Sequence, residues 1–170
     1  MNKKTNIPIA ALCARGREIG YVLMVDGRII RYGVKTIKGK RRGVVFLRQV
    51  ARILMGVLDR LTPQYMVVVE DVSHRTKPGA VNQEIAKLKK EWMDTGSCQV
   101  RTISLKDVKY RLCDDHSVSH RALVEMVLAR YPLVAGLRVD FAIYRPLYWE
   151  LVCLAIGMAD AVERPQDKTS

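Results

Sequence analysis

The segment EIGYVLMVDGRIIRYGV, residues 18–34, says most about the fold class of this 170-residue chain. Two runs rich in β-branched and aromatic residues flank Asp26-Gly27, a pair that tolerates the positive φ angles of a tight hairpin turn. The segment therefore predicts a β-hairpin. The apolar run IPIAALCA, residues 7–14, precedes it and predicts a buried strand. We expect these first three strands to be antiparallel neighbours.

Downstream of the hairpin, helical and strand patterns alternate. Apolar residues at helical spacing predict a helix over residues 44–61. Thr62-Pro63 ends it, because proline disfavours helical geometry in the residue before it. The run YMVVVE, residues 65–70, predicts a parallel strand that is buried on both faces. The remaining expected elements are a helix over 81–96, a strand over 98–105, and helices over 105–113, 118–131 and 145–163.

Residues with capping chemistry lie at several of these boundaries. Gly96 lies at the end of the second expected helix, where glycine readily adopts the left-handed geometry that ends helices. Ser104 and Ser117 precede the next two helices, where a serine hydroxyl can accept a hydrogen bond from the first turn. The order of elements indicates an α/β domain with a mixed sheet: three antiparallel strands, then parallel strands, flanked by helices. We expect one domain over 1–164 and a flexible tail over 165–170.

The chain carries a large excess of positive charge. It has 29 Lys and Arg against 17 Asp and Glu, which gives a formal net charge of +12. This charge favours a nucleic-acid partner, because basic side chains displace counterions condensed on phosphates; an anionic membrane surface and plain solubility are the alternatives. No apolar stretch reaches the roughly 18 residues of a membrane span. The four cysteines form no Cys-x-x-Cys pair, so the usual zinc spacing is missing. With no signal peptide or membrane span recognised, we expect a cytoplasmic protein with free thiols.

Three pieces of the sequence, in order, resemble the RuvC-type resolvases of the ribonuclease H-like superfamily. They are residues 18–34, YMVVVE at 65–70 and YWELVCLAIGMADA at 148–161. In that family an opening strand ends in aspartate, a glycine-aromatic pair begins the second strand, a later strand ends in glutamate, and a closing helix carries further acids. Gly20-Tyr21 matches the glycine-aromatic pair. The resemblance implies a ribonuclease H-like sheet, a Holliday-junction DNA partner and a homodimer.

The resemblance also places Glu70 at the strand-end acid and Glu150 at the acid of the closing helix, as candidate catalytic and metal-binding residues. Two-metal phosphodiester cleavage requires several oxygen ligands that hold two Mg²⁺ ions about 3.5–4 Å apart. Cys13 stands where the family has its first-strand aspartate, and a thiol is a poor ligand for magnesium. Leu147 stands at the position of another acid. The acid cluster is therefore incomplete.

Basic residues are most concentrated in three segments of the chain. These are the loop after the third expected strand, the loop after Glu70, and the helix expected over 81–96. Such side chains would contact phosphates without reading sequence, although a solvated face is the alternative. Aromatic residues make up only 6% of the chain, which favours duplex or branched substrates over single strands. We expect DNA rather than RNA as the partner. The candidate nucleic-acid-binding residues are Lys38, Lys40, Arg41, Arg42, His74, Arg75, Lys77, Lys87, Lys89 and Lys90.

The sequence thus predicts a protein that recognises the DNA backbone or branched-DNA geometry, with catalysis weakened by the exchange at Cys13. Two alternatives remain open. One is an active, structure-selective endonuclease that uses Mg²⁺ or Mn²⁺, in which Asp71 or Asp140 completes the site of Glu70 and Glu150. Asp71 is the weaker of these two, because successive strand residues point to opposite faces. The other alternative is a basic scaffold subunit of a nucleoprotein assembly, with no metal cofactor.

Overall fold

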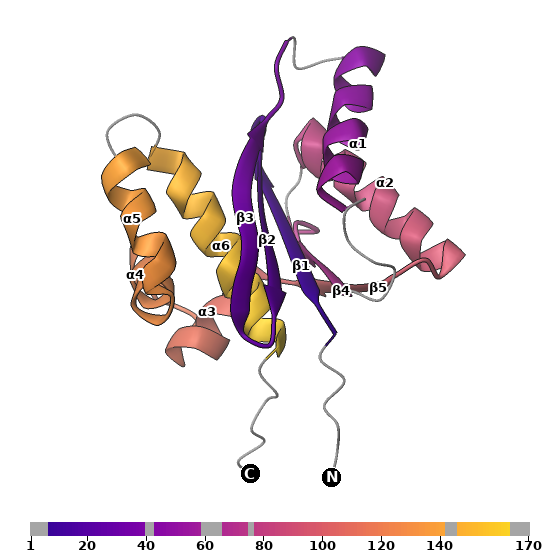
Figure 1. Cartoon of the computed structure of the whole chain (residues 1–170). Coiled ribbons are helices and arrows are strands. Elements are labelled where there is room, and N and C mark those ends of the chain that lie inside the picture. Colours follow the sequence, from indigo (N-terminus) through magenta and orange to yellow (C-terminus); the bar gives the residue numbers. More distant parts are fainter. Residues whose placement is uncertain (1–6, 40–42, 59–65, 75–76, 142–145, 164–170) are drawn as a thin grey trace.

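A five-stranded sheet lies at the centre of the computed structural model (Figure 1). Its strands are β1 (Ile9–Arg15), β2 (Glu18–Val25), β3 (Arg28–Thr36), β4 (Met66–Glu70) and β5 (Gln99–Ile103). They lie in the order β3-β2-β1-β4-β5; β1, β2 and β3 pair antiparallel, and β4 and β5 join them in parallel. This is the mixed sheet that the sequence predicts. The structure describes residues 7–39, 43–58, 66–74, 77–141 and 146–163, with the backbone alone for 58, 137–141 and 146–149.

Two tight turns connect the first three strands. In the turn between β2 and β3, Asp26 has a φ of 53° and Gly27 a φ of 70°. The hairpin predicted at Asp26-Gly27 is therefore confirmed. A register shift opposite Leu23 and Met24 leaves Ile30 of β3 without a partner on β2, and this residue is 60% exposed. Such a bulge increases the local twist of a strand, and here it lies in a strand at the edge of the sheet.

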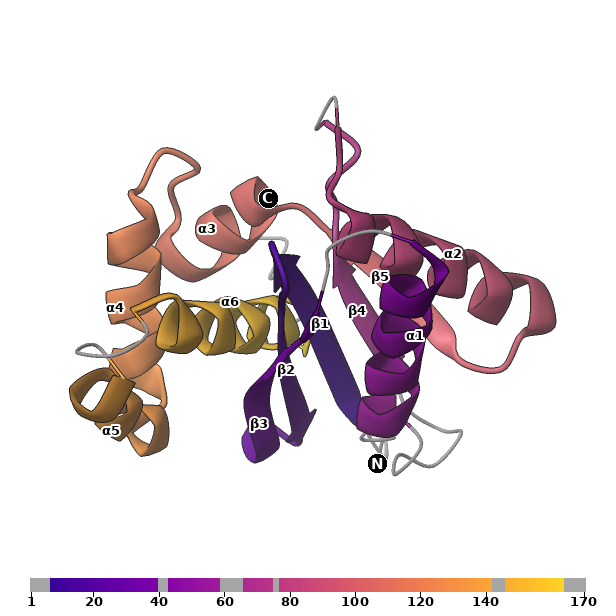
Figure 2. The same ribbon diagram turned by 90° about the horizontal axis from the view of Figure 1, so that it is seen from above.

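Helices cover both faces of the sheet (Figure 2). They are α1 (Val44–Leu58), α2 (Ala80–Thr95), α3 (Leu105–Cys113), α4 (His120–Arg130), α5 (Pro132–Phe141) and α6 (Pro146–Glu163). One face packs against α1 and α2, and the other against α6, around which α3, α4 and α5 are arranged. Successive residues of β1 enter opposite layers: Leu12 packs with the α1 side, and Ala11 and Cys13 with the α6 side. The apolar core therefore has two layers, one on each face of the sheet.

Two predicted helix boundaries are confirmed. Gly96 directly follows α2 with a φ of 64°, the left-handed geometry that glycine adopts without steric cost. Ser104 caps α3, since its hydroxyl accepts a hydrogen bond from the backbone N–H of Asp107 at 3.0 Å. The predicted helix over 44–61 corresponds to α1; its last three residues and the stop at Thr62-Pro63 lie outside the described residues.

The helix predicted over 118–131 corresponds to α4, but its predicted cap, Ser117, is wrong. The helix α4 begins at His120, and Ser119 caps it by accepting a hydrogen bond from the backbone N–H of Ala122 at 3.0 Å. The hydroxyl of Ser117 instead donates to Asp115. Pro132, expected to mark a helix end, is the first residue of α5. Proline is tolerated there because the first turn of a helix does not need its N–H.

Asp140, expected in the loop before the last helix, belongs to α5. Within the described part of the chain, no helix has both the length and the apolar composition needed to cross a membrane.

Candidate functional site

The carboxyl ends of four strands lie at one edge of the sheet. β1 and β3 are both antiparallel to β2, while β4 and β5 run parallel to β1. The helix α6 runs the opposite way: Leu151 near its start contacts Cys13, whereas Glu163 at its end accepts a hydrogen bond from Gly27 at the other edge. The start of α6 therefore faces the strand ends. We call the charged residues at this edge the strand-end surface: Arg15, Arg17, Lys38 and Glu70.

An ion pair between Arg15 and Glu70 occupies the centre of this surface. Arg15 Nη1 donates to Glu70 Oε2 at 2.5 Å, and Arg15 Nη2 donates to Glu70 Oε1 at 2.9 Å. The two side chains meet because β1 and β4 are paired with Leu12 opposite Val69, which brings the ends of both strands together. The Glu70 side chain is 3% exposed and that of Arg15 is 26% exposed. The carboxylate of Glu70 is thus already neutralised by a side chain of the same protein.

The environment of Arg15 keeps its guanidinium charged. Burial by itself lowers the pKa of Arg15, but the hydrogen bonds to Glu70 and the negative charge of Glu70 outweigh burial, so the pKa is raised. A two-pronged arginine–carboxylate pair combines favourable charge with fixed geometry. At this position the pair holds a permanent positive group beside the end of β1.

Cys13 is buried beneath the ion pair. Its Sγ donates to the backbone oxygen of Leu151 at 3.4 Å and weakly to that of Gly20 at 3.8 Å. Burial, and secondly the negative charge of Glu70, raise the pKa of the Cys13 thiol to about 12. The thiol is therefore neutral near pH 7, and it offers no anionic ligand to a hard metal ion such as Mg²⁺.

Glu150, on α6, lies beside the start of α4. Its Oε2 lies 3.9 Å from Nε2 of His120, the first residue of α4. Burial raises the pKa of Cys153 to about 12, and the negative charges of Glu150 and of Glu125 on α4 add to this effect. Glu70 is thus held by Arg15 of β1, and Glu150 lies beside His120 of α4.

The remaining acids do not complete a metal site in the described residues. Asp71 Oδ1 accepts a hydrogen bond from the backbone N–H of Ser73, and the hydrogen bonds from Ser73 are the main reason that the pKa of Asp71 is lowered. On the closing helix, Asp160 pairs with Arg130 at 2.7 Å and accepts from the Tyr131 hydroxyl at 2.8 Å. The side chains of Asp140 and Leu147 lie outside the described set.

A divalent metal ion fits this site poorly. Where side chains are described, no three His, Cys, Asp or Glu residues are grouped closely enough to hold a metal ion. At the strand ends, the buried carboxylate of Glu70 is held by Arg15, and its neighbour Cys13 is a neutral thiol. Two Mg²⁺ ions need several converging oxygen ligands, which these residues do not supply.

Several of the basic residues singled out from the sequence are exposed. Lys38 follows β3, His74 and Lys77 follow β4, and Lys87 and Lys90 lie on α2. Lys89 is half-buried and close enough to Asp71 to contribute to lowering the pKa of that carboxyl. The other four candidates, Lys40, Arg41, Arg42 and Arg75, lie outside the described residues.

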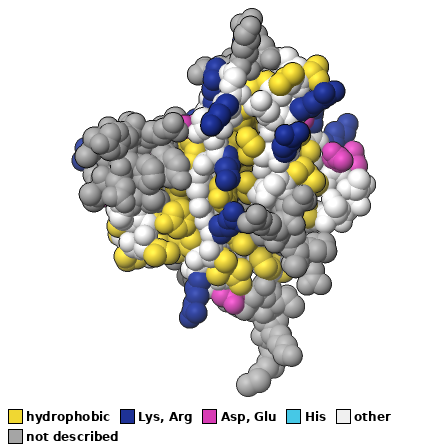
Figure 3. All heavy atoms as spheres, turned by 45° about the horizontal axis from the view of Figure 1, so that its top comes forward, with side chains coloured by type: hydrophobic (Ala, Val, Ile, Leu, Met, Phe, Trp, Pro, Cys, Tyr) yellow, Lys and Arg dark blue, Asp and Glu magenta, His cyan; other side chains and the backbone are white. Residues whose placement is uncertain are grey.

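The edge strand β3 carries a row of exposed cations that were not among the candidates predicted from the sequence. Its exposed basic residues are Arg28, Arg31 and Lys35. Figure 3, in which the strand-end edge is tilted forward, shows Lys and Arg side chains in a column along this strand, with hydrophobic side chains on either side. The sequence could have indicated this row through its repeated basic residues within a predicted strand. Their exposure, however, depends on β3 lying at the edge of the sheet.

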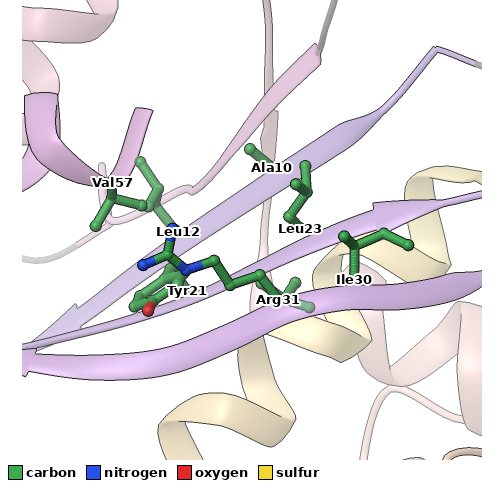
Figure 4. A pocket seen from close by; sticks show the side chains of 8 residues that line it. Ala10, Leu12, Tyr21, Leu23, Ile30, Arg31 and Val57 are labelled. Carbon is green, nitrogen blue, oxygen red and sulfur yellow. The ribbon is translucent and has the colours of Figure 1, made fainter. Parts of the chain in front are cut away.

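A small pocket opens beside this row, between β3 and α1. It has a volume of about 150 Å³ and is lined mainly by apolar residues, among them Tyr21, Ile30 and Val57. Figure 4 shows the Arg31 side chain extending along the sheet toward Tyr21. The aliphatic part of Arg31 thus covers apolar surface beside the pocket.

Comparison with known proteins supports the fold. No family model and no curated protein matches the chain. Among solved structures, Thermus thermophilus RuvC matches with a TM-score of 0.64 and 15% identity, covering 91% of this chain and 92% of that chain. T. thermophilus RuvC in complex with Holliday junction substrate matches with the same values. The chain therefore has the ribonuclease H-like fold of RuvC, as its sequence predicts.

Proposed function

We propose that this protein binds DNA through the phosphate backbone, prefers branched DNA, and does not cleave it efficiently. The observation that carries the proposal is the ion pair of Arg15 with Glu70 at the strand ends. A nuclease with this fold that cleaves DNA through metal ions needs carboxylates at the strand ends that are not already paired with a basic side chain. Among the described residues, the buried carboxylate of Glu70 at the strand ends is neutralised by Arg15, beside a protonated Cys13.

Three features support binding. The net charge of +12 favours a polyanionic partner. The exposed cations Arg28, Arg31 and Lys35 on β3 lead toward Lys38 at the strand ends, which suits contact with successive phosphates. One of the similar structures is a RuvC complex with Holliday junction substrate, which makes a four-way junction the first DNA to test. The proposal includes a homodimer, since such a junction has two-fold symmetry.

The test is a paired assay on the purified full chain. Binding and cleavage of a four-way junction are compared with those of a linear duplex of the same arm sequence, at two salt concentrations, in EDTA and in Mn²⁺. We expect binding that is tighter for the junction and weaker at high salt, with DNA that stays intact. Mn²⁺-dependent cleavage that Glu70→Gln abolishes would show an active endonuclease instead. Absence of binding to either DNA would contradict the proposal.

A further inference from the structure

We infer that Arg15 is itself a phosphate-binding residue, whose guanidinium supplies at the strand ends the positive charge that a divalent metal ion would otherwise supply. The inference rests on the proposed nucleic-acid binding and names the group that contacts the phosphodiester. Its starting point is the mismatch between the fold, which is that of a resolvase, and the strand-end residues, which do not fit a metal ion.

The hydrogen bonds of Arg15 leave one edge of its guanidinium available. A guanidinium has five N–H groups. In the described structure three are engaged: Nη1 donates to Ala14 O and to Glu70 Oε2, and Nη2 donates to Glu70 Oε1. The two that remain are Nε–H and the second hydrogen of Nη2. These two are parallel and form the side edge of the group, which matches two oxygens of one phosphate.

Glu70 holds this donor pair in place before any ligand arrives. Arginine loses considerable rotamer freedom when it is fixed, and here the bidentate contact with Glu70 fixes it in the folded protein. A phosphate therefore meets a side chain that is already ordered, which lowers the entropic cost of binding. The Arg15 side chain remains 26% exposed, so a ligand can reach part of it.

Two further cations, Arg17 and Lys38, belong to the strand-end surface together with Arg15. Arg17 follows in the turn after β1, and its buried Nε has no hydrogen-bond partner among the described residues. The backbone N–H of Ile37 donates to Arg17 O at 2.9 Å, so Arg17 lies beside Lys38. A buried N–H without a partner is costly. An anion bound by Arg15 would also be attracted by the positive charges of Arg17 and Lys38 on the strand-end surface.

The decisive variant is Arg15→Gln/Glu70→Gln. It removes both charges, leaves the net charge unchanged, and leaves no unpaired charge in the core. The matched control is Arg130→Gln/Asp160→Asn, an ion pair with nearly the same exposure, 26% and 4%, between α4 and α6. Circular dichroism and thermal melting verify that both variants are folded.

Dissociation constants for the four-way junction are then measured in EDTA and in Mg²⁺ at equal ionic strength. We expect the Arg15→Gln/Glu70→Gln variant to bind about tenfold more weakly and the control to bind as the wild type does. Glu70→Gln alone retains the guanidinium, although it weakens the contact that orders Arg15, so it should bind more tightly than the double variant. Affinity should be the same in EDTA and in Mg²⁺.

The outcomes separate the two proposals. If the wild type binds but the double variant binds equally well, Arg15 is not the phosphate ligand, and the proposed function still holds. If Glu70→Gln loses affinity and the wild type needs Mg²⁺ to bind, the phosphate is contacted by a metal ion and not by Arg15. If the double variant does not fold, Arg15→Lys is tested instead. Lysine retains the positive charge but lacks the two parallel N–H donors of the guanidinium. Unchanged affinity of Arg15→Lys would overturn the inference. If the wild type does not bind, the proposed function fails first.

Discussion

Cys13 and Glu70 lie near each other at the ends of β1 and β4, and their partners determine the chemistry of each. The thiol of Cys13 is enclosed by the backbone of Leu151 and Gly20, so it stays protonated. The carboxylate of Glu70 is almost as deeply buried, but Arg15 compensates its charge. Burial without a counter-charge disfavours the ionised form, whereas burial with a two-pronged counter-ion permits it.

The buried thiol predicts a loss of stability at alkaline pH. The pKa of Cys13 is about 12 in the folded chain and 9.0 as the ordinary value. Between these values the unfolded chain has lost a proton that the folded chain keeps, so the free energy of unfolding falls as the pH rises. At about pH 10 this loss amounts to about 1 kcal/mol.

The measurement is urea unfolding of the wild type and of Cys13→Ala at pH 8 and about pH 10. Removal of the sulfur lowers stability at both pH values, so the informative quantity is the change between them. The variant should lose less stability than the wild type on going to the higher pH. A difference between the two proteins that does not change with pH would contradict a raised pKa at Cys13.

Packing between elements places the start of α6 directly on β2. At Gly20 an added Cβ would lie 2.8 Å from Leu151 O and 2.9 Å from Leu151 Cβ. Backbone atoms cannot move aside as the end of a flexible side chain can. The glycine of the predicted Gly20-Tyr21 pair is thus required by the close approach of a helix, which in turn encloses Cys13.

Gly20→Ala should therefore destabilise the protein by about 2–3 kcal/mol, as overpacking of a rigid contact does. Gly56→Ala is the matched control, because Gly56 lies in α1 with nothing within 4 Å of an added Cβ. The control should be stabilised by about 0.5 kcal/mol, since alanine favours helix more than glycine does. Thermal melting of both variants checks this. Equal melting temperatures for Gly20→Ala and the wild type would show that α6 does not pack so closely.

Across the molecule as a whole, positive charge follows the edge of the sheet. The row on β3 and the strand-end surface adjoin each other where β3 ends, near Lys38. Exposed cations on an edge strand also discourage pairing with strands of other molecules. Protection against aggregation explains charge on β3 alone, whereas binding of a phosphate backbone explains why the charge continues past the strand.

Salt dependence distinguishes these two roles. Arg28→Gln/Lys35→Gln should reduce the slope of log affinity against log salt concentration for duplex DNA by about 2, because each lost phosphate contact contributes about 0.9. Arg101→Gln/Arg121→Gln removes the same charge from β5 and α4, where both residues are exposed, and should leave the slope nearly unchanged. Equal slopes for the two variants would mean that the DNA does not follow β3.

The sequence by itself determined the strands, the hairpin at Asp26-Gly27, and the ends marked by Gly96 and Ser104, because these depend on neighbours within a few residues. It failed to predict α5, since Pro132 is compatible both with the end of one helix and with the start of another. Local patterns also indicated that a carboxylate, Glu70, would end a buried strand.

The ion-pair partner of Glu70 is determined by tertiary packing alone. Arg15 and Glu70 are 55 positions apart in the chain, and only the register of β1 against β4 brings them together. In the same way, the orientation of α6 brings Glu150 beside His120 of α4. A residue's type is written in the sequence, but its electrostatic partner is set by the long-range contacts that form when the sheet and its helices assemble.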